Sequence, residues 1–490
     1  MSSISYHIKT ERTFTLIRKY AWLVTVIVAL GGQFLPELGL VVPLIMLALM
    51  ATSLFKGRYW CGNFCPHGSL YDQLILPLSR NKNIPGFLKS RFFVAFFFIF
   101  FLFNLSRRFI SLFQQMNNPF QQTGFIFSNT YLMVLLAGGL LGIFISPRTW
   151  CQFCPMGTIQ LLFYRLGKGL EINSKSDERI TISAKELCHS CGKCARVCPM
   201  QLKPYLQFNS QNQLESEECI RCNTCVENCP AGILQLASKS KSEEIRKKTS
   251  LDGFDRADFY QARIKKIREL KEDIREFTFE LMDAASMEFK PGQFVLIEVM
   301  EEEEMYRAYT ISRSSEDSQE ISITVKLLED GYGTNLLFND FKEGDRVTLK
   351  GPLGRELVVD PKNEKVLFLA NGIGITPFVC MVQCLLAEKD FSGQATLLYG
   401  ARYEEDLIYH QFFSQAAEEN PHFNYQQILS RPKGDNYRQG YVTHLIEEME
   451  LSPDYKVYIC GSPAMASDSM EILKNKGIPA ENIHYEDFAV

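Results

Sequence analysis

Histidine is scarce in this chain, which has seven histidines among 490 residues. A membrane haem held by two histidines needs a pair of them within apolar segments, and only His67 lies near such a segment. A membrane flavocytochrome is therefore not expected. His189 lies within a run of cysteines that already completes a ligand set, so we interpret it as a surface residue or one that supports the ligands.

Strong charge is also missing, and no removable leader is expected. The chain has 52 basic and 56 acidic residues, a net charge of −4, and no long basic face, so no nucleic-acid partner is expected. The first apolar stretch is long, lacks a small-residue cleavage site and is followed at once by another, which argues against a signal peptide. A length of 490 residues favours three or more modules.

Fifteen cysteines are present, and eight of them form two identical runs. The runs are Cys188-x-x-Cys191-x-x-Cys194-x-x-x-Cys198-Pro199 and Cys219-x-x-Cys222-x-x-Cys225-x-x-x-Cys229-Pro230. With this spacing, three thiolates of one run hold one [4Fe-4S] cluster and the fourth reaches over to the other cluster. We therefore expect one cluster on Cys188, Cys191, Cys194 and Cys229, and a second on Cys219, Cys222, Cys225 and Cys198.

Structural zinc and disulfides are the alternatives for these runs. Zinc sites usually separate two Cys-x-x-Cys pairs by a longer loop and lack the terminal Cys-Pro, and disulfides need an oxidising compartment. Two matching copies favour clusters and a reducing compartment. Over about residues 183–237 the segment resembles the bacterial two-cluster ferredoxins, which implies an α+β ferredoxin domain at 180–237.

Four apolar stretches precede the runs, at about residues 16–35, 38–55, 91–106 and 130–147. Each approaches the length that spans a bilayer and none shows a polar face, so we predict a transmembrane domain of four helices at 1–170. Lysine and arginine gather before the first stretch, between the second and third, and after the fourth. By the positive-inside rule, we expect both termini and the cofactor domains on the cytoplasmic side of a bacterial-type inner membrane.

Two further cysteine pairs lie just beyond the second and fourth stretches. They are Trp60-Cys61-Gly-Asn-Phe-Cys65-Pro66-x-Gly68 and Trp150-Cys151-Gln-Phe-Cys154-Pro155-x-Gly157, an internal repeat whose second copy is one residue shorter. Four thiolates could bind a third iron–sulfur centre, form a redox-active dithiol, or pack as small buried hydrophobes. Over about residues 15–235, the chain resembles the membrane polyferredoxins of the NapH and NosR type, which accompany nitrate and nitrous-oxide reductases.

The second half of the chain has a different pattern. Residues 238–257 are rich in Ser, Lys and Glu and are predicted to be a linker. Alternating segments such as 294–299 and 321–328 predict a small antiparallel β-barrel at 258–360. Over 361–490, buried strands alternate with helices, which predicts an α/β domain with parallel strands at 366–370, 395–399 and 456–460. The expected fold class is therefore multidomain.

Three short motifs suggest the chemistry of this half. Arg307-Ala-Tyr309-Thr310-Ile-Ser312 suits a flavin, because Arg can fork onto pyrophosphate, Tyr can stack, and a hydroxyl can serve the redox-active ring nitrogen. Gly331-Tyr-Gly333-Thr334 offers backbone amides and a hydroxyl to phosphate oxygens. Gly372-Ile-Gly374-Ile-Thr376-Pro377 follows a strand and opens a helix, whose N-terminus favours anionic phosphate.

Together with Tyr399-Gly-Ala-Arg402, Cys460-Gly461-Ser-x-x-Met465 and Tyr485-Glu486-Asp-Phe488, these motifs resemble the ferredoxin–NADP⁺ reductase superfamily over about 258–490. The resemblance implies FAD on the barrel and NADH or NADPH on the α/β domain. Its flavin contacts would be Arg307, Tyr309, Thr310, Ser312, Gly331, Gly333 and Thr334, and its nucleotide contacts Gly372, Gly374, Thr376, Pro377, Arg402 and Gly461. Thr310, Cys460 and Glu486 would lie at the hydride-transfer locus.

Three details leave questions open. Asn371 stands where many members of the superfamily have glycine, which puts the tightness of that turn in question. Ser430-Arg431 resembles the pair that binds the 2′-phosphate of NADPH, but similar sequences occur in NADH users, so the nucleotide stays unspecified. Cys380 and Cys384 lie one helical turn apart on an apolar helix, which favours core packing over a metal site.

The order of the modules predicts a membrane-bound NAD(P)H:acceptor oxidoreductase. Electrons would pass from NAD(P)H through FAD and two [4Fe-4S] clusters to a membrane or periplasmic acceptor, such as a quinone or a redox protein, and the flow could also run backward. Two alternatives stay open: an accessory electron donor for the maturation or reactivation of a metalloenzyme, and a membrane redox sensor.

Overall fold

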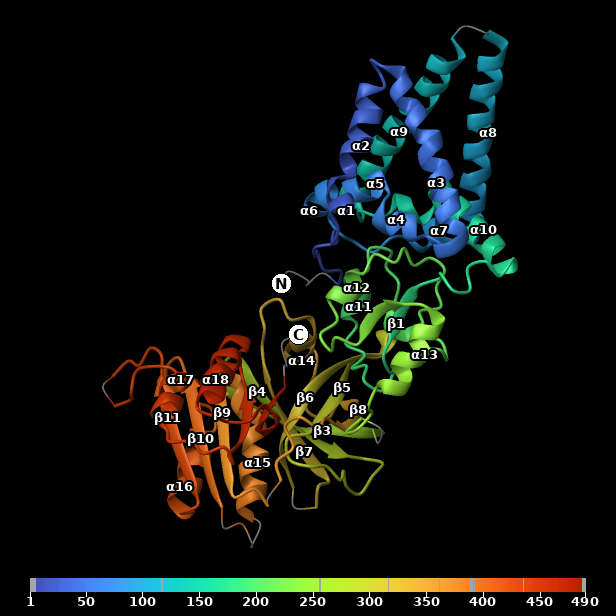
Figure 1. Cartoon of the computed structure of the whole chain (residues 1–490). Coiled ribbons are helices and arrows are strands. Elements are labelled where there is room, and N and C mark those ends of the chain that lie inside the picture. Colours follow the sequence, from blue (N-terminus) through green and yellow to red (C-terminus); the bar gives the residue numbers. More distant parts are fainter. Residues whose placement is uncertain are drawn as a thin grey trace. The chain divides into compact units, whose positions relative to one another are not determined.

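The computed structural model describes residues 6–115, 118–254, 257–315, 317–360, 362–387, 391, 393–434 and 436–486, without the side chains of 112–115. Phe488 of the last sequence motif lies outside the described residues. The chain divides into two compact units, Met1–Ser250 and Leu251–Val490, which are described separately (Figure 1).

The division between the units falls within residues 238–257, the predicted linker. Part of this segment is nevertheless helical, because α13 covers Lys239–Lys248. Lys and Glu favour helices, and the hydroxyl of Ser242 anchors this one by donating a 2.6 Å hydrogen bond to the carbonyl of Gln211.

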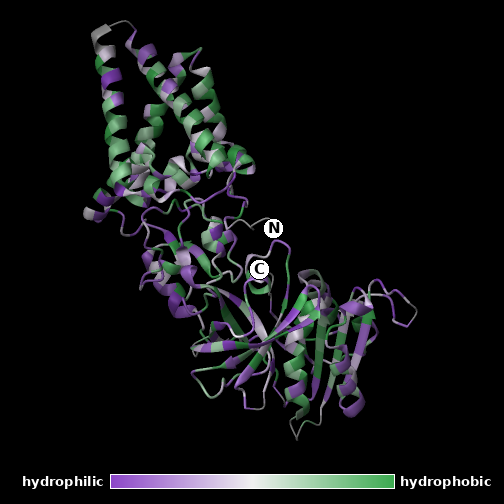
Figure 2. Cartoon of the chain, turned by 180° about the vertical axis from the view of Figure 1, so that it is seen from behind, coloured by the Kyte–Doolittle hydropathy of each residue, from purple (hydrophilic) through white to green (hydrophobic). Residues whose placement is uncertain are grey.

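Three helices among the described residues are long and apolar enough to cross a membrane, at Pro36–Lys56, Arg91–Ser111 and Pro119–Phe144. They comprise the 3-10 turn η2 (Pro36–Leu40) with α3 (Val41–Lys56), then α8 (Arg91–Gln115) and α9 (Pro119–Phe144). Figure 2 shows these helices largely in the green of hydrophobic residues. They correspond to the second, third and fourth predicted stretches, and α9 begins earlier than expected.

The first predicted stretch forms a shorter helical run. It consists of α1 (Leu16–Tyr20), α2 (Trp22–Val26) and the π-helix η1 (Ile27–Gly31). The run ends in a turn at Gly32, shortly before Pro36, and proline cannot continue a helical hydrogen-bond ladder. The four-helix membrane module is therefore corrected to three helices of spanning length and one shorter run.

Small residues let these segments approach closely. A Cβ atom on Gly39 would lie 1.9 Å from the carbonyl oxygen of Gly124, and one on Gly124 would lie 2.0 Å from that of Pro36. A Cβ atom on Gly32 would lie 2.0 Å from the hydroxyl of Ser128. Close backbone packing of this kind is the usual way in which helices associate in a membrane.

Both Cys-Pro motifs lie at the same end of the long helices (Figure 1). The first follows α3 and forms α4 (Tyr59–Asn63) and α5 (Pro66–Leu70), and the second forms η4 (Trp150–Gln152) and α10 (Pro155–Gly169). Cys65 and Cys154 are the N-cap residues of α5 and α10, and each is followed by a proline in the first helical position, where its missing N–H costs nothing. The chain continues from α5 through η3 (Tyr71–Ile75), α6 (Leu76–Leu78) and α7 (Gly86–Lys89) to α8.

The rest of the first unit is a small α+β module. Its strands β1 (Arg179–Ile182) and β2 (Leu234–Ala237) are antiparallel, with Arg179 opposite Ala237. Between them lie the short helices α11 (Lys193–Arg196), η5 (Pro204–Leu206) and α12 (Thr224–Glu227). The core combines Ile180, Ile182 and Leu234 with cysteines of both runs, so the cysteines form part of the core of this module.

The second unit begins with a closed six-stranded antiparallel barrel, as predicted. Its strands follow the order β3-β4-β7-β6-β5-β8, and α14 (Tyr332–Asn339) connects β7 to β8. The strands are β3 (Asp258–Lys271), β4 (Ile274–Leu281), β5 (Phe294–Met300), β6 (Met305–Ser314), β7 (Glu320–Lys326) and β8 (Arg346–Leu353).

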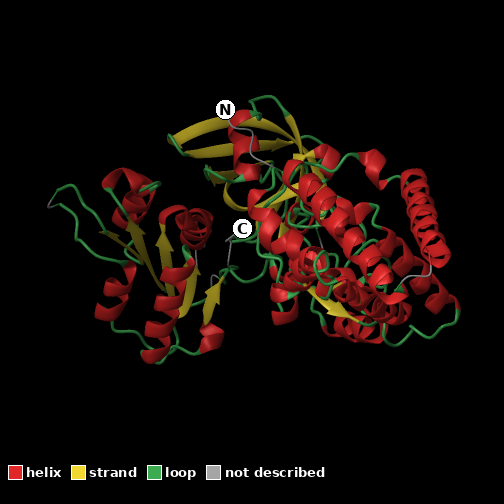
Figure 3. Cartoon of the chain, turned by 90° about the horizontal axis from the view of Figure 1, so that it is seen from above, coloured by secondary structure: helices red, strands yellow, loops and turns green. Residues whose placement is uncertain are grey.

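The predicted α/β domain follows, with a parallel sheet in the order β11-β10-β9-β12-β13. The strands are β9 (Lys365–Asn371), β10 (Gln394–Ala401), β11 (Phe423–Leu429), β12 (Lys456–Cys460) and β13 (Ile483–Tyr485). Helices cover both faces (Figure 3): α15 (Thr376–Ala387) and α16 (His410–Glu419) on one, α17 (Val442–Glu448) and α18 (Pro463–Asn475) on the other.

The strand order reverses at β9, whose neighbours are β10 and β12. In open α/β sheets, ligands bind at such a switch point, outside the carboxyl ends of the strands. Here those ends carry Gly372 after β9 and Gly461 after β12. The topology therefore places two of the predicted nucleotide-binding segments side by side.

Candidate functional site

The two ferredoxin-like cysteine runs have the same backbone conformation. Ser190 and Gly192 in the first run, and Arg221 and Asn223 in the second, occupy equivalent positions and all have positive φ. The helices α11 and α12 begin at equivalent positions as well. The repeat seen in the sequence is therefore a repeat of structure, in which left-handed turns direct the thiols inward.

The cysteines predicted to hold the first cluster, here called the first set, come from both runs and lie close enough to affect one another's pKa values. Burial raises the pKa of Cys188 to about 11, and the nearby thiols of Cys191 and Cys229 contribute to this shift. The pKa of Cys194 is raised by burial and by the same neighbours, Cys191, Cys188 and Cys229. The structure thus brings together Cys188, Cys191, Cys194 and Cys229, the four residues predicted for one cluster.

The second set shows the reciprocal arrangement. Burial raises the pKa of Cys219 to about 12, and Cys222 and Cys198 add to the shift. Burial also raises the pKa of Cys198 to about 11, with Cys222 as the neighbouring thiol. Cys225 has Cys219, Cys222 and Cys198 among its neighbours. Cys198 belongs to the first run in the sequence, but in the structure it lies beside the cysteines of the second run.

These thiols fit iron–sulfur clusters in their hydrogen bonding. The backbone N–H groups of Ser190 and Arg221 donate to the sulfurs of Cys188 and Cys219 at 3.4 Å in each case. Such donors stabilise thiolate ligands and tune the cluster that they hold. Within the described part of the chain, no three His, Cys, Asp or Glu side chains converge closely enough to hold a single metal ion. Ligand roles for the eight cysteines stay a prediction.

The four membrane-side cysteines also form one group. Burial raises the pKa of Cys154 to about 12, with Cys151 and Cys61 as neighbouring thiols. The pKa of Cys65 is likewise raised by burial, then by Cys61 and Cys151. The amide of Gln160 donates to the sulfur of Cys61 at 3.0 Å. Despite their unequal spacing, the two pairs therefore face each other.

Each of two buried arginines contacts the Cys-Pro motif of the other repeat. Arg58 precedes the first motif, yet it donates to the carbonyl of Cys151 in the second at 2.9 Å. Arg148 precedes the second motif and donates to the carbonyl of Cys61 in the first at 3.2 Å. Each arginine also packs on the glycine of the opposite motif, Arg58 on Gly157 and Arg148 on Gly68. The two copies of the internal repeat are thus held together by equivalent arginine contacts on either side of the four thiols.

The second ferredoxin set lies directly beside the membrane-side thiols. One apolar cluster contains Cys61, Cys151 and Ile220, and Cys198 and Cys222 pack against it. Gly62, next to Cys61, permits this approach, since a Cβ atom there would lie 2.0 Å from the carbonyl oxygen of Ile220. Both cysteine pairs contact the ferredoxin module, because the amide of Gln152 donates to the carbonyl of Met200 at 3.4 Å.

Sequence reasoning missed one set of residues at this junction. Arg12, Arg18 and Arg148 surround Asp72, and all four side chains are at most 3% exposed. These arginines belong to the positive charges that predict membrane orientation, but they are internal ion-pair partners. A signal was available, because Asp72 is the only acidic residue between Glu37 and Glu171.

The predicted flavin residues meet at the junction of β6 and α14. Arg307 on β6 packs on the first turn of α14, because a Cβ atom on Gly333 would lie 2.6 Å from its Nε atom. The hydroxyl of Thr334 accepts a hydrogen bond from the N–H of Leu328 at 3.2 Å and donates to the carbonyl of Gly331 at 3.1 Å. A guanidinium beside a helix N-terminus suits pyrophosphate.

The other predicted flavin residues lie further along β6. Thr310 is 7% exposed, and the half-buried Tyr309 has a pKa raised by burial. Ser312 is fully buried, donates to the carbonyl of Ser322 at 3.1 Å and accepts a 3.4 Å hydrogen bond from the Thr324 hydroxyl, so its hydroxyl is engaged by β7. The structure therefore groups Arg307, Gly331, Gly333 and Thr334 at one end and sets Ser312 apart from them.

The predicted nucleotide residues meet at the switch point of the sheet. Gly372 has a φ of 53°, which favours glycine. A Cβ atom on Gly374 would lie 2.2 Å from the carbonyl oxygen of Cys460. Thr376 begins α15, with Pro377 in its first turn. Backbone approach this close, at a helix N-terminus, is what a dinucleotide pyrophosphate requires.

Asn371 now has a structural explanation. Its side-chain oxygen accepts a 2.8 Å hydrogen bond from the N–H of Ser462, and its amide donates to the Ser462 hydroxyl at 3.0 Å. The backbone of Asn371 is extended, with a φ of −136°, so no glycine is needed there. The residue therefore ties the ends of β9 and β12 together and leaves the turn tight.

The remaining predicted residues lie at the carboxyl ends of three other strands of the sheet, β10, β12 and β13. Arg402 is exposed at the end of β10, and its carbonyl accepts a 2.9 Å hydrogen bond from the N–H of Arg431. Cys460, at the end of β12, is 4% exposed, and its pKa is raised by burial and by nearby Glu486. Burial, with Glu356 nearby, raises the pKa of Glu486 to about 8. Cys460 and Glu486 are therefore neighbours, as the predicted hydride-transfer locus requires.

Family models match most of the modules. Residues 261–356 match the oxidoreductase FAD-binding domain, and 368–471 match the oxidoreductase NAD-binding domain. Residues 180–230 match a 4Fe-4S dicluster domain, and the segments 38–85 and 128–173 match a 4Fe-4S binding domain. The predicted cofactors, FAD, a nicotinamide dinucleotide and [4Fe-4S] clusters, are confirmed by these domains.

Known proteins resemble about half of the chain. The toluate 1,2-dioxygenase electron transfer component of Pseudomonas putida is 31% identical over 231 residues, which cover 47% of this chain and 68% of that protein. Ferredoxin–NADP reductase B of Sorangium cellulosum is 31% identical over 244 residues, 47% of this chain and 98% of that protein. This chain spans only 60% of the length of three further relatives.

Among solved structures, the crystal structure of Amycolatopsis cytochrome P450 reductase GcoB matches with a TM-score of 0.44 and 26% sequence identity. The match covers 47% of this chain and 70% of that chain.

Substitution of Gly374 tests the nucleotide site. Because the new Cβ atom of Gly374→Ala would overlap the carbonyl of Cys460, the ends of β9 and β12 must separate. We expect the apparent affinity for NAD(P)H to fall at least about tenfold, or ~1.4 kcal/mol, with the FAD content unchanged. Stopped-flow flavin reduction measures the affinity. Gly434→Ala is the matched control, since no atom lies within 4 Å of its Cβ position, and equal affinities in both variants would contradict the assignment.

Glu486 predicts a pH dependence. Its folded-state pKa of about 8 lies above its ordinary value, so the folded protein binds this proton more tightly, and stability falls as pH rises toward 8. Deprotonation also places a negative charge beside Cys460. We expect flavin reduction by NAD(P)H to slow above about pH 8 and Glu486→Gln to remove this transition.

Glu356→Gln provides the control for this pH profile. It removes a neighbouring negative charge, so the transition should move to lower pH without disappearing. A profile that is the same in the wild type and in Glu486→Gln would exclude Glu486 as the titrating group.

Proposed function

We infer the function from one premise: the chain belongs to the ferredoxin–NADP⁺ reductase-type family of FAD- and NAD(P)-binding oxidoreductases, joined here to 4Fe-4S domains. It is an NAD(P)H-dependent oxidoreductase. We propose that its electrons continue from the flavin through the ferredoxin clusters to a third iron–sulfur centre on Cys61, Cys65, Cys151 and Cys154, and from there to an acceptor at a membrane.

One observation carries this proposal. Cys198 and Cys222 of the second ferredoxin set pack against the apolar cluster that contains Cys61 and Cys151. Two sets of thiols that pack in one apolar region are suited to direct electron transfer. The match of 38–85 and 128–173 to a 4Fe-4S binding domain supports an iron–sulfur cluster on the membrane-side set. Cys188, Cys194 and Cys229 of the first set pack in another apolar cluster, together with Cys219 and Cys225 of the second set, so the second set would link the first set to the membrane-side thiols.

The residues of the chain have distinct tasks in this path. FAD, when bound, supplies the chemistry that accepts a pair of electrons and releases them singly. Arg307 and the first turn of α14 would hold its pyrophosphate, and Gly372 and Gly374 would let the dinucleotide approach. Glu486, neutral at pH 7 because of its raised pKa, would keep negative charge away from the hydride-transfer locus. Apolar side chains surround Cys61 and Cys151, which are both buried.

The membrane location rests on the three helices of spanning length. The cysteine pairs lie at one end of these helices (Figure 1), so the third centre would lie at a membrane surface. A quinone or a redox protein would accept the electrons there. The positive charges near the helix ends that remain exposed, such as Arg80, Lys82 and Arg91, support a cytoplasmic position for this end.

An accessory electron donor for a metalloenzyme is the second candidate function. One relative is the electron transfer component of a toluate 1,2-dioxygenase, that is, one part of a larger enzyme system. The two candidates differ in turnover. A quinone reductase oxidises NAD(P)H with a soluble quinone analogue in detergent, whereas an accessory donor turns over only when its protein partner is added.

The cluster content tests the proposal directly. Anaerobically purified protein should contain about twelve irons per chain, four for each of three centres, with matching acid-labile sulfide and one FAD. Cys61→Ser should lower the iron content to about eight while flavin reduction and the EPR signals of the two ferredoxin clusters persist. Reduction of the acceptor should be lost.

Cys384→Ser serves as the matched control, because Cys384 lies in α15 and belongs to none of the three thiol groups. It should retain all iron and all activity. A wild-type protein with about eight irons per chain would refute the third centre, and the membrane-side cysteines would then have another role.

A further inference from the structure

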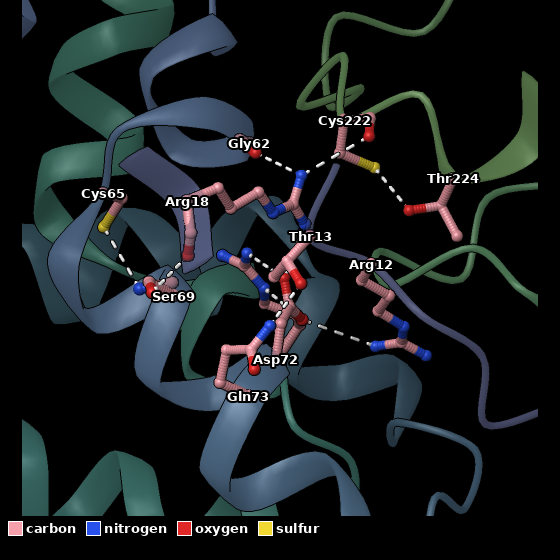
Figure 4. Close-up of polar contacts among 12 residues, drawn as sticks. Arg12, Thr13, Arg18, Gly62, Cys65, Ser69, Asp72, Gln73, Cys222 and Thr224 are labelled. Atoms are coloured by element: carbon pink, nitrogen blue, oxygen red, sulfur yellow. Dashed lines mark hydrogen bonds and ion pairs between the residues drawn. The ribbon is translucent and has the colours of Figure 1, made fainter. Parts of the chain in front are cut away.

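A buried cluster of charge lies where the ferredoxin module meets the membrane-side thiols. Asp72 in η3 contacts three arginines, which we call the arginine node (Figure 4). Its Oδ2 atom lies 2.6 Å from Nη2 of Arg18 and 2.6 Å from Nη2 of Arg148. Its Oδ1 atom accepts a 3.2 Å hydrogen bond from Nε of Arg148 and lies 3.7 Å from Nη1 of Arg12.

The node has an excess of positive charge. Three guanidinium groups share one carboxylate, which leaves a net charge of 3 − 1 = +2. Arginine cannot lose its proton in a protein, and the side chains are at most 3% exposed, so neither titration nor water relieves this charge. Unpaired buried charge is very costly, so the surroundings must supply negative charge.

The spare donors of the node face both thiol groups. Nη1 of Arg148 lies 3.6 Å from the sulfur of Cys151 and donates to the carbonyl of Cys61 at 3.2 Å. Nη1 of Arg18 donates to the carbonyl of Gly62, and it also contacts the carbonyl of Cys222 at 3.4 Å. The node therefore contacts the backbone of the second ferredoxin set, and both the backbone and a sulfur of the membrane-side set.

Arg12 completes this arrangement on the ferredoxin side. Cys222 and Cys198 are the thiols whose charge would act on Arg12. Its Nε and Nη1 atoms are buried, and among the described residues they have no hydrogen-bond partner. Donors of this kind, 2% exposed and left without an acceptor, point to an anionic group that belongs beside them.

We propose that the arginine node is the electrostatic positioning element of the relay, compensating the negative charge of the membrane-side centre and of the second ferredoxin cluster and raising their reduction potentials. This inference rests on the proposed function, since it needs clusters in both thiol groups. Four thiolates around a [4Fe-4S] core carry a net charge of about −2, and reduction adds one more negative charge. Positive charge beside the cluster therefore favours the reduced form.

The contacts of the node bear on the alternatives for the four membrane-side cysteines. A protonated dithiol, a disulfide or packed thiols would be neutral, and the second ferredoxin cluster, with a charge of about −2, would then compensate the +2 charge of the node alone. A thiolate cluster would place negative charge where Arg148 contacts Cys151 and Cys61. The contacts of Arg148 therefore favour an anionic centre on that side.

Two substitutions of opposite sign test the node by EPR redox titration of the detergent-purified chain. Arg12→Gln removes a positive charge and should shift the midpoint potentials of the second ferredoxin cluster and the membrane-side centre to more negative values. Asp72→Asn removes the only negative charge of the node and should shift them to more positive values. The double variant, with both changes, should return close to the wild-type potentials.

Three further variants and measurements make the result decisive. Arg12→Lys keeps the charge and should restore the potential that Arg12→Gln loses. Arg165→Gln breaks an exposed ion pair with Glu217, 2.9 Å long, and should leave all potentials unchanged. Iron counts on every variant show that the clusters are assembled, so a folding defect is recognised by iron loss and not mistaken for a potential shift.

The outcomes separate this inference from the proposed function. If the wild type holds about twelve irons and both single variants keep them, unchanged or same-direction shifts overturn the role of the node and leave the third centre intact. If the wild type holds about eight irons, the third centre fails, whatever the variants do. Opposite shifts that cancel in the double variant support the node, because a purely structural role would not produce them.

Discussion

The burial of charge is the constraint on which the first unit depends. Asp72 is completely buried, and it is held by arginines from the N-terminal segment and from the second Cys-Pro motif. Arg18 and Arg148 also donate to loops that carry cysteines, and Arg12 is an electrostatic neighbour of Cys222 and Cys198. Charge therefore connects segments that hydrophobic packing alone would leave free to slide, since a guanidinium–carboxylate pair has a defined geometry.

The internal repeat shows how duplication can build one site from two motifs. Arg58 and Arg148 each reach across to the opposite Cys-Pro motif, so neither half is complete by itself. The two halves differ where their neighbours differ. Arg148 pairs with the buried Asp72, whereas Arg58 pairs with Glu218 of the ferredoxin module at 2.5 Å. The repeat is thus symmetrical around the thiols and asymmetrical toward the ferredoxin clusters.

The second unit depends more on backbone than on charge. At the switch point between β9 and β12, Gly374 allows a close approach and Asn371 ties the strand ends together. Asn371 departs from the pattern of its superfamily, but its contacts with Ser462 show that its side chain closes the turn. Ser312 is the contrasting case, because its position in the flavin motif did not reveal that its hydroxyl is engaged by Ser322 and Thr324 of β7.

Local sequence patterns were enough to predict the modules and their order. Cysteine spacing, apolar runs and glycine motifs are local features, and local geometry decides which cluster ligands, membrane helices and phosphate-binding turns they can form. The predicted length of the first membrane helix was too great, because the turn at Gly32 shortens an otherwise apolar run. Tertiary structure alone decided that the two Cys-Pro motifs share one site, that the second ferredoxin set adjoins it, and that three arginines meet at Asp72. Those contacts join residues far apart in the chain, and a charged residue looks the same in the sequence whether it is exposed at a membrane surface or buried against its partner.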